Sequence, residues 1–207
     1  MARLNPHTLV KISDLKKVHF NGEIPEWVSA IFEETNYVVV RRGSQSKAIP
    51  IGIRGYEKSQ RLAGWIDPRT ILDVVTPHDA VKRLGLVNTE RINLPAFKIA
   101  KKVVPLLKKY DWGIGGSLQF ELVTGLPMVK MNSDIDIIMQ RPNPKIEVNT
   151  AKDLLHSLEN TAGTHVDIQI VHNQNGFSLE EYAQQRSSQI MLKTEQGPQL
   201  VTDPWVY

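Results

Sequence analysis

Asp134 and Asp136 are the residues of this sequence whose types and spacing best suit chemistry. They flank Ile135 and lead into the apolar run 137–139, which predicts a strand. Residues two apart in a strand point to the same face, so the two carboxylates project together while Ile135 enters a core. Adjacent carboxylates repel unless a cation lies between them. Mg²⁺ binds carboxylate and phosphate oxygens together, so the pair predicts a magnesium site for a phosphorylated substrate.

A third carboxylate, Asp167, lies in a second predicted strand, residues 165–171. The alternation places His165, Asp167 and Gln169 on one face of that strand. If this strand pairs beside the first, Asp167 converges with the other two acids on one metal site, as a ligand or as a base. We expect His165 to lie near this site as a structural residue rather than to ligate the metal.

A glycine turn precedes the acids. Gly115 and Gly116 follow an apolar strand and let the backbone turn where a Cβ atom would clash. Ser117 then opens a predicted helix that is stopped by Gly125. The exposed N–H groups at the start of such a helix suit a phosphate, so we place Gly115, Gly116 and Ser117 in substrate binding.

Taken together, the glycine-glycine-serine turn, the Asp-x-Asp strand and the later acidic strand resemble the nucleotidyltransferase superfamily, the DNA polymerase β-like fold. Sixteen residues separate Ser117 from Asp134, which is somewhat more than is usual there, and a longer loop around residues 125–130 would absorb them. The resemblance implies an α+β fold, in which a C-terminal mixed sheet with helices carries the acids. A small, basic N-terminal α/β domain would precede it.

The expected domains are residues 1–88 and 89–207. Thr76 and Pro77 open a helix that closes at Gly85, because threonine is a good N-cap and proline suits the first helical position. Residues 85–94 form the expected connection, and a helix opened by Pro95 starts the second domain.

Five basic residues are expected to gather at the ends of neighbouring elements in the first domain. Strands are predicted over residues 37–40 and 49–55, and Lys58 and Arg61 would share a face if the segment that contains them, residues 56–66, is helical. Arginine suits bidentate phosphate contacts. We weigh phosphate or acidic-partner binding equally against a solvated basic rim for this set: Arg41, Arg42, Arg54, Lys58 and Arg61.

Composition sets outer bounds on function. Residues 1–110 carry 19 Lys and Arg and 10 Asp and Glu, whereas residues 111–207 carry 6 and 12. This asymmetry, +9 against −6, suggests a polyanionic substrate or an acidic partner. With 41% hydrophobic residues, no cysteine, no run long enough to span a membrane and no signal-peptide core, we expect a soluble, cytoplasmic protein that has no membrane partner.

A narrower resemblance covers nearly the whole chain. The runs V-V-V-R-R, I-P-I-G-I-R-G and S-Q-R-L-A-G-W, joined to G-G-S-L-Q-F-E-L-V-T-G-L-P and S-D-I-D-I-I, resemble phosphoribosyl-dephospho-CoA transferases, the malonate decarboxylase holo-acyl-carrier-protein synthases. The resemblance implies transfer from 2'-(5''-triphosphoribosyl)-3'-dephospho-CoA to a serine of the acyl-carrier subunit of malonate decarboxylase, with release of pyrophosphate. The catalytic aspartates of the family fall on Asp134 and Asp136.

Two other readings stay open at this stage. A nucleotidyltransferase that uses an ordinary NTP would share all three acids and differ only in its donor. A catalytically inactive binding module is disfavoured by retention of the acids. We expect no DNA partner, because no helix-turn-helix is apparent and the basic residues do not alternate with aromatic ones.

Overall fold

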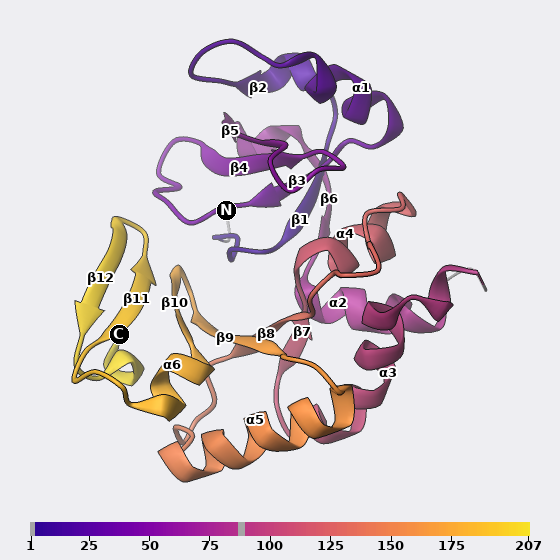
Figure 1. Cartoon of the computed structure of the whole chain (residues 1–207). Helices are drawn as coiled ribbons and strands as arrows, with labels where there is room; N and C mark the ends of the chain where they lie inside the picture. Colours follow the sequence, from indigo (N-terminus) through magenta and orange to yellow (C-terminus); the bar gives the residue numbers. More distant parts are fainter. Residues whose placement is uncertain (1–2, 87–89) are drawn as a thin grey trace. The chain divides into compact units, whose positions relative to one another are not determined.

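A computed structural model describes residues 3–86 and 90–207 of the chain. Within these residues the structure is mixed α+β, with two separate sheets (Figure 1). Two compact units divide the chain: Met1–Thr76 with Glu195–Gly197, and Pro77–Thr194 with Pro198–Tyr207. The domain boundary expected after residue 88 falls at residues 87–89, which lie outside the described residues.

The helix that begins at Pro77 belongs to the second unit rather than to the first. Gly113 explains why, because a Cβ atom there would overlap the backbone of Pro77 and His78. The strand that contains Gly113 and the start of this helix are therefore in direct backbone contact. The sequence signals for the helix were correct, but they did not indicate the unit against which it packs.

The placement of this boundary changes the charge comparison. Residues 1–76 carry 11 Lys and Arg and 8 Asp and Glu, whereas residues 77–207 carry 14 of each. Most of the basic excess of residues 1–110 therefore lies in the helical segments that open the second unit. Because Glu195 belongs to the first unit, the two units carry +2 and +1, so total charge does not separate a substrate-binding unit from a catalytic one.

The first unit is built on a sheet with the strand order β2-β5-β4-β3-β1-β6. Its neighbouring strands all pair antiparallel, so the expected α/β domain is in detail an antiparallel sheet with helical additions. The elements, in chain order, are β1 (Leu9–Ile12), the 3₁₀ turn Leu15–Lys17, β2 (Val18–His19), α1 (Glu26–Glu34), β3 (Tyr37–Val40), β4 (Ile49–Arg54), β5 (Arg61–Ile66), the 3₁₀ turn Pro68–Thr70 and β6 (Ile71–Val75).

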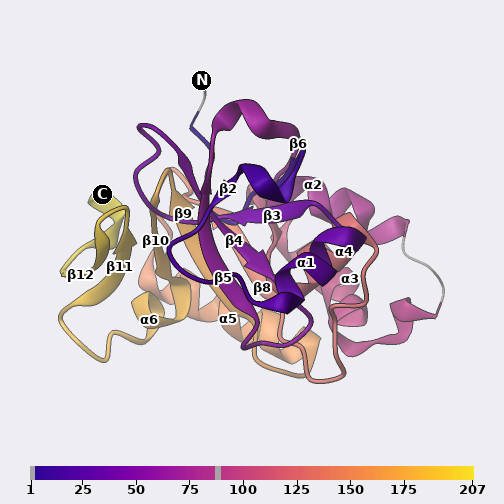
Figure 2. The same ribbon diagram turned by 90° about the horizontal axis from the view of Figure 1, so that it is seen from above.

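Helix α1 packs on β4 through the buried Val28 and Ile31 (Figure 2). The strands expected over residues 37–40 and 49–55 are confirmed. The helical alternative for the segment that contains Lys58 and Arg61 is wrong. Arg61 begins β5, which pairs with β4 in a hairpin, and Gly55 donates its N–H to the carbonyl of Gln60 to close the turn.

The second unit holds a mixed sheet with the strand order β12-β11-β10-β9-β8-β7. Its helices are α2 (Pro77–Lys82), α3 (Pro95–Leu107), α4 (Gly116–Thr124), α5 (Val148–Ala162) and α6 (Leu179–Gln184), and its 3₁₀ turns are Arg83–Gly85, Arg91–Asn93 and Pro204–Val206. Its strands are β7 (Trp112–Ile114), β8 (Asp136–Gln140), β9 (Asp167–His172), β10 (Asn175–Ser178), β11 (Ile190–Thr194) and β12 (Gly197–Val201).

Helices α3 and α5 pack against each other and cover one side of this sheet (Figure 1). Phe97 of α3 and Leu158 of α5 are buried in one hydrophobic core with Ile137 and Met139 of β8. Strands β8 and β9 are parallel and are joined through α5, because a parallel pair needs a long connection. The pairs β7–β8, β9–β10 and β10–β11 are antiparallel. At the other end of the sheet, Trp205 makes edge-on contacts with Phe177 and Tyr182 and is buried in the core.

Candidate active site

The expected glycine turn and helix are confirmed. Strand β7 ends at Ile114, and α4 begins at Gly116, one residue earlier than expected. Gly116 has a φ of +62°, in the left-handed region where a side chain is strained. The first turn of α4 receives no side-chain cap from Gly115, so its leading N–H groups are left for other acceptors. Gly125, at φ +78°, ends the helix as expected by donating to the carbonyl of Glu121.

The carboxylate of Asp136 lies directly against Gly116. A Cβ atom at Gly116 would overlap Oδ2 of Asp136 and come within 2.9 Å of its Cγ. The backbone reinforces the approach, because Gly115 donates its N–H to the carbonyl of Asp136 at 2.9 Å. Two independent features therefore require glycine at position 116: the positive φ and the closeness of the Asp136 carboxylate. The result is an acidic group held beside the positive end of a helix.

Strand pairing places Asp167 opposite Asp136. The two residues are direct partners in the parallel β8–β9 ladder, so their side chains leave the same face of the sheet. Asp134 lies two residues before β8 and is exposed, so only Asp136 of the Asp-x-Asp pair belongs to the strand. Ile135, between them, is buried in the core as expected.

The aspartates offer oxygen ligands on one face, but they do not form a closed cage. Across the described residues, no three Asp, Glu, His or Cys side chains lie close enough together to hold a metal ion by themselves. Mg²⁺ usually binds through one or two carboxylates, with water and substrate phosphates completing its shell. Asp136 and Asp167 fit that kind of site, and metal binding stays a prediction.

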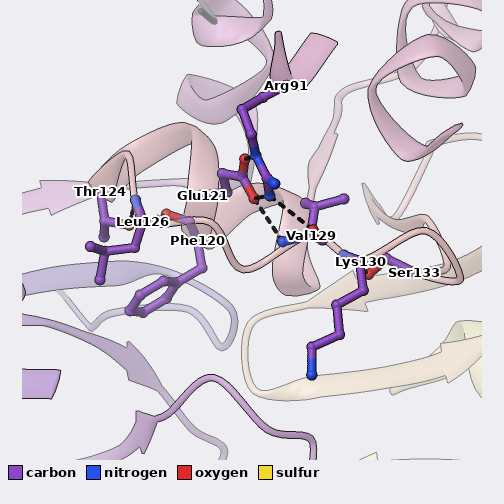
Figure 3. A network of polar contacts seen from close by, with 8 residues as sticks. All are labelled: Arg91, Phe120, Glu121, Thr124, Leu126, Val129, Lys130 and Ser133. Atoms are coloured by element: carbon purple, nitrogen blue, oxygen red, sulfur yellow. Dashed lines mark hydrogen bonds and ion pairs between the residues drawn. The ribbon is translucent and has the colours of Figure 1, made fainter. Parts of the chain in front are cut away.

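Sequence reasoning missed a buried ion pair that fixes the loop leading to the aspartates. Glu121 of α4 is 6% exposed and accepts two hydrogen bonds from Arg91, at 2.7 and 2.8 Å (Figure 3). Glu121 also accepts the N–H of Val129, while Arg91 donates to the carbonyl of Val129. The hydrogen bonds that Arg91 donates to the carboxylate of Glu121 raise the pKa of Arg91. The signal in the sequence was an acid between the apolar Phe120 and Leu122 of one helix.

The turn that follows Val129 is also held by hydrogen bonds, and it ends next to Asp134. Lys130 donates its N–H to Oγ of Ser133 at 2.8 Å, and Ser133 donates its N–H back to the carbonyl of Lys130 at 3.0 Å (Figure 3). The loop of extra length between α4 and β8 is therefore anchored at Val129 and again at Ser133. It positions Asp134 although it contains no regular element.

Gln169 is a second residue near the aspartates that sequence reasoning did not propose for the site. It lies two residues after Asp167 on β9 and is 7% exposed. Among the described groups its Nε2 has no hydrogen-bond partner, although a buried amide usually has one. The alternation along β9 had already put Gln169 on the face of Asp167. A buried donor next to the acids is suited to an oxygen atom of a substrate.

His165 lies just before β9 and is exposed. Its Nδ1 is 3.0 Å from Oε1 of Glu159, and its Nε2 is 3.6 Å from Oε2 of Glu180. Both ring nitrogens therefore face carboxylates from α5 and α6. This surface cluster, rather than the aspartates, accounts for its contacts.

The structure divides the five basic residues of the first unit. Arg41, Arg54 and Arg61 line one cavity of about 270 Å³. Arg42 does not line it, and burial lowers the pKa of Arg42 to about 10. Lys58 lies in the turn between β4 and β5, where its carbonyl accepts a hydrogen bond from Nε of Arg61 at 3.3 Å.

Comparison with known families agrees with this architecture. The family profile described as "Phosphoribosyl-dephospho-CoA transferase MdcG N-terminal domain" matches residues 5–77, and the profile for the C-terminal domain matches residues 86–204. The chain belongs to this family. It is therefore a transferase, and the expected family resemblance is confirmed over both units.

Named relatives of the phosphoribosyl-dephospho-CoA transferase family match over nearly the full length. The transferase of Klebsiella pneumoniae (strain 342) is 29% identical over 201 residues, covering 97% of this chain and 95% of the relative. That of Pseudomonas aeruginosa is 29% identical over 203 residues, covering 97% and 93%. No solved structure matches the chain. In the part of this family member that the structure describes, no helix is long and apolar enough to cross a bilayer.

Proposed function

We propose that this transferase moves the phosphoribosyl-dephospho-CoA group from 2'-(5''-triphosphoribosyl)-3'-dephospho-CoA to a serine of the acyl-carrier subunit of malonate decarboxylase. The serine Oγ attacks the phosphorus next to the ribose, the bond to the bridging oxygen of the pyrophosphate breaks, and pyrophosphate leaves. A phosphodiester forms, and the serine proton passes to a base. The family supports the reaction class, and the placement of Asp136 opposite Asp167 beside the start of α4 carries the assignment of the site.

The second unit would then have the nucleotidyltransferase fold. Its strand-turn-helix from β7 into α4, followed by a parallel pair of strands with paired acids, supports this proposal. Asp134, Asp136 and Asp167 would hold Mg²⁺, which when bound neutralises charge on the transferring phosphoryl group. Asp167 is also a candidate base for the serine proton. The N–H groups of Gly116 and Ser117 would bind the leaving pyrophosphate.

Gln169 would assist by donating its amide N–H to an oxygen of the donor. Its buried position beside Asp167 supports that role, because an unpartnered buried donor is unfavourable until it meets an acceptor. The Arg91–Glu121 pair would act indirectly, by positioning the loop before Asp134. Neither residue of that pair needs to contact substrate for this.

The intact mass of the carrier subunit tests the proposal. Apo carrier, Mg²⁺ and the triphosphoribosyl donor are incubated with this enzyme or with its Asp134→Ala variant. The expected result is a gain equal to the donor minus pyrophosphate with the natural enzyme and none with the variant. Labelling of a protein or small molecule by ATP or another NTP, with no change in carrier mass, would overturn the assignment of donor and acceptor.

A further inference from the structure

We propose that the exposed face of the N-terminal sheet carries a second anion site, a phosphate-binding pocket formed by Arg41, Arg54 and Arg61. Its ligand is a phosphate or pyrophosphate group of a small molecule. This site lies wholly within the first unit and uses none of the aspartates. It rests on charge and sheet geometry, and it stands whether or not the proposed reaction is correct.

Strand register puts the three arginines on one face. Arg54 of β4 and Arg61 of β5 are direct partners across the hairpin. Arg41 follows β3 and donates its N–H to the carbonyl of Pro50, two positions before Gly52 on β4. Residues two apart share a face, so Arg41 projects on the same side as Gly52 and Arg54. Strands β3, β4 and β5 are neighbours in the sheet (Figure 2).

The floor between the arginines is made of small residues. Val39, Gly52 and Ala63 lie side by side across the three strands. A Cβ atom at Gly52 would lie 3.3 Å from Cδ of Arg41, so the arm of Arg41 lies across Gly52. A larger residue at this position would lift that arm. The missing side chain leaves room for a ligand beneath the guanidinium groups.

The residue types around this cavity suit an anion. Arg54 and Arg61 are cations in directly opposed positions of the hairpin, and Arg41 lines the same cavity. None of the residues that the structure places around this cavity is Asp or Glu. Guanidinium groups bind phosphate through two parallel hydrogen bonds, so three of them suit a di- or triphosphate better than a single carboxylate.

Size narrows the ligand to a phosphate head group. The cavity of about 270 Å³ lies just below the range of roughly 300–1,000 Å³ that is typical of pockets for whole drug-sized ligands. The opposite face of the same strands is filled by buried apolar side chains, including Val38, Val40 and Ile51, so it offers no second opening there. A ligand would therefore enter from the arginine face. Its phosphate group would occupy the cavity, and the rest of the ligand would remain outside.

Titration calorimetry on the full chain tests this site, with pyrophosphate and triphosphate as probes and EDTA present to remove divalent cations. The natural protein is expected to bind at least one probe, and Arg54→Gln/Arg61→Gln to bind it about ten- to a hundredfold more weakly, as the loss of charge-assisted hydrogen bonds predicts. Added salt should weaken binding to the natural protein. Arg54→Lys/Arg61→Lys keeps the positive charges but removes the planar guanidinium groups that form paired hydrogen bonds. Its affinity for the probe should lie between that of the natural protein and that of the glutamine variant.

Two controls separate this site from the aspartates. Arg69→Gln removes an exposed arginine of the same unit that pairs with Asp67, and it should bind as the natural protein does. Asp136→Asn should also keep metal-free binding, even if it abolishes transfer. Absence of probe binding in EDTA, or equal binding by the natural protein and the Arg54/Arg61 variant with both folded by circular dichroism, would overturn the pocket and leave the proposed reaction untouched.

Discussion

The two units use glycine in the same way for opposite charges. In the first, Gly52 makes room for the arm of Arg41, and in the second, Gly116 makes room for the carboxylate of Asp136. The contacts differ in tightness. At Gly52 a methyl group would press on a flexible side chain at 3.3 Å, whereas at Gly116 it would overlap the carboxylate itself, and the backbone there has a positive φ. The acidic site is therefore built rigidly, and the basic pocket can adapt.

The largest expected effect tests the acidic site directly. Asp136→Asn should lower the rate of carrier labelling about 10³-fold, because charge stabilisation of a transferring phosphoryl group is worth several kcal/mol. Carrier mass against time measures it. Asp153→Asn, on the exposed surface of α5, is the matched control and should leave the rate unchanged. An active Asp136→Asn enzyme would remove this residue from the mechanism.

Gly116→Ala should cost both stability and activity. The positive φ alone costs about 1–2 kcal/mol, and displacement of the Asp136 carboxylate adds to it. Gly125→Ala is the matched control, since its φ is +78° and nothing lies within 4 Å of the added methyl group. It should lose comparable backbone free energy and keep its rate. Urea unfolding and carrier labelling measure the two quantities, and equal activities would mean that the carboxylate can move aside.

Breaking the buried pair behind the aspartates should mainly destabilise the second unit. Arg91→Ala leaves the 5% exposed carboxylate of Glu121 without its charged partner, and we expect a loss of about 2–3 kcal/mol. The loss stays below that of a fully buried pair because Arg91 is 34% exposed. Arg69→Ala, from an exposed pair, should change the free energy of unfolding by less than about 1 kcal/mol. Similar losses in both variants would contradict the anchoring role.

The smallest expected effect concerns Gly52, and it separates stability from binding. Gly52→Ala should leave the free energy of unfolding unchanged or raise it by up to about 1 kcal/mol, as a glycine without positive φ allows. It should nevertheless weaken pyrophosphate binding several-fold by pushing on Arg41. Calorimetry and urea unfolding on the same preparation test both parts. Lower stability with unchanged binding would show that Gly52 serves packing alone.

Local signals predicted the elements that carry the aspartates, because these elements are short and are bounded by glycine and by changes of residue pattern. The glycine turn, α4 and the strands that carry Asp136 and Asp167 were each indicated by residue type and alternation. Their pairing had to be assumed, since alternation gives the face of a strand but not its neighbour. The structure supplies that pairing in the parallel register of β8 and β9.

What sequence reasoning missed depends on contacts between distant segments. Arg91 and Glu121 are 30 residues apart, and no local pattern links them. The backbone contact of Gly113 with Pro77 is another link between distant segments that no local pattern indicates. Of the five basic residues, the structure brings Arg41, Arg54 and Arg61 to one cavity, and phosphate binding by them stays a prediction. Arg54 of β4 and Arg61 of β5 are direct partners across the hairpin. A helix in the segment of Arg61 would not have predicted that pairing.

The parallel pairing of Asp136 with Asp167 also has a consequence for the order of folding. Parallel strands cannot meet through a tight turn, so this ladder closes only after the chain has passed through all of α5. Contacts of that sequence separation form late, after local helices and hairpins. During refolding, helical circular dichroism should recover before transferase activity, because the strand pairing that builds the proposed active site forms late.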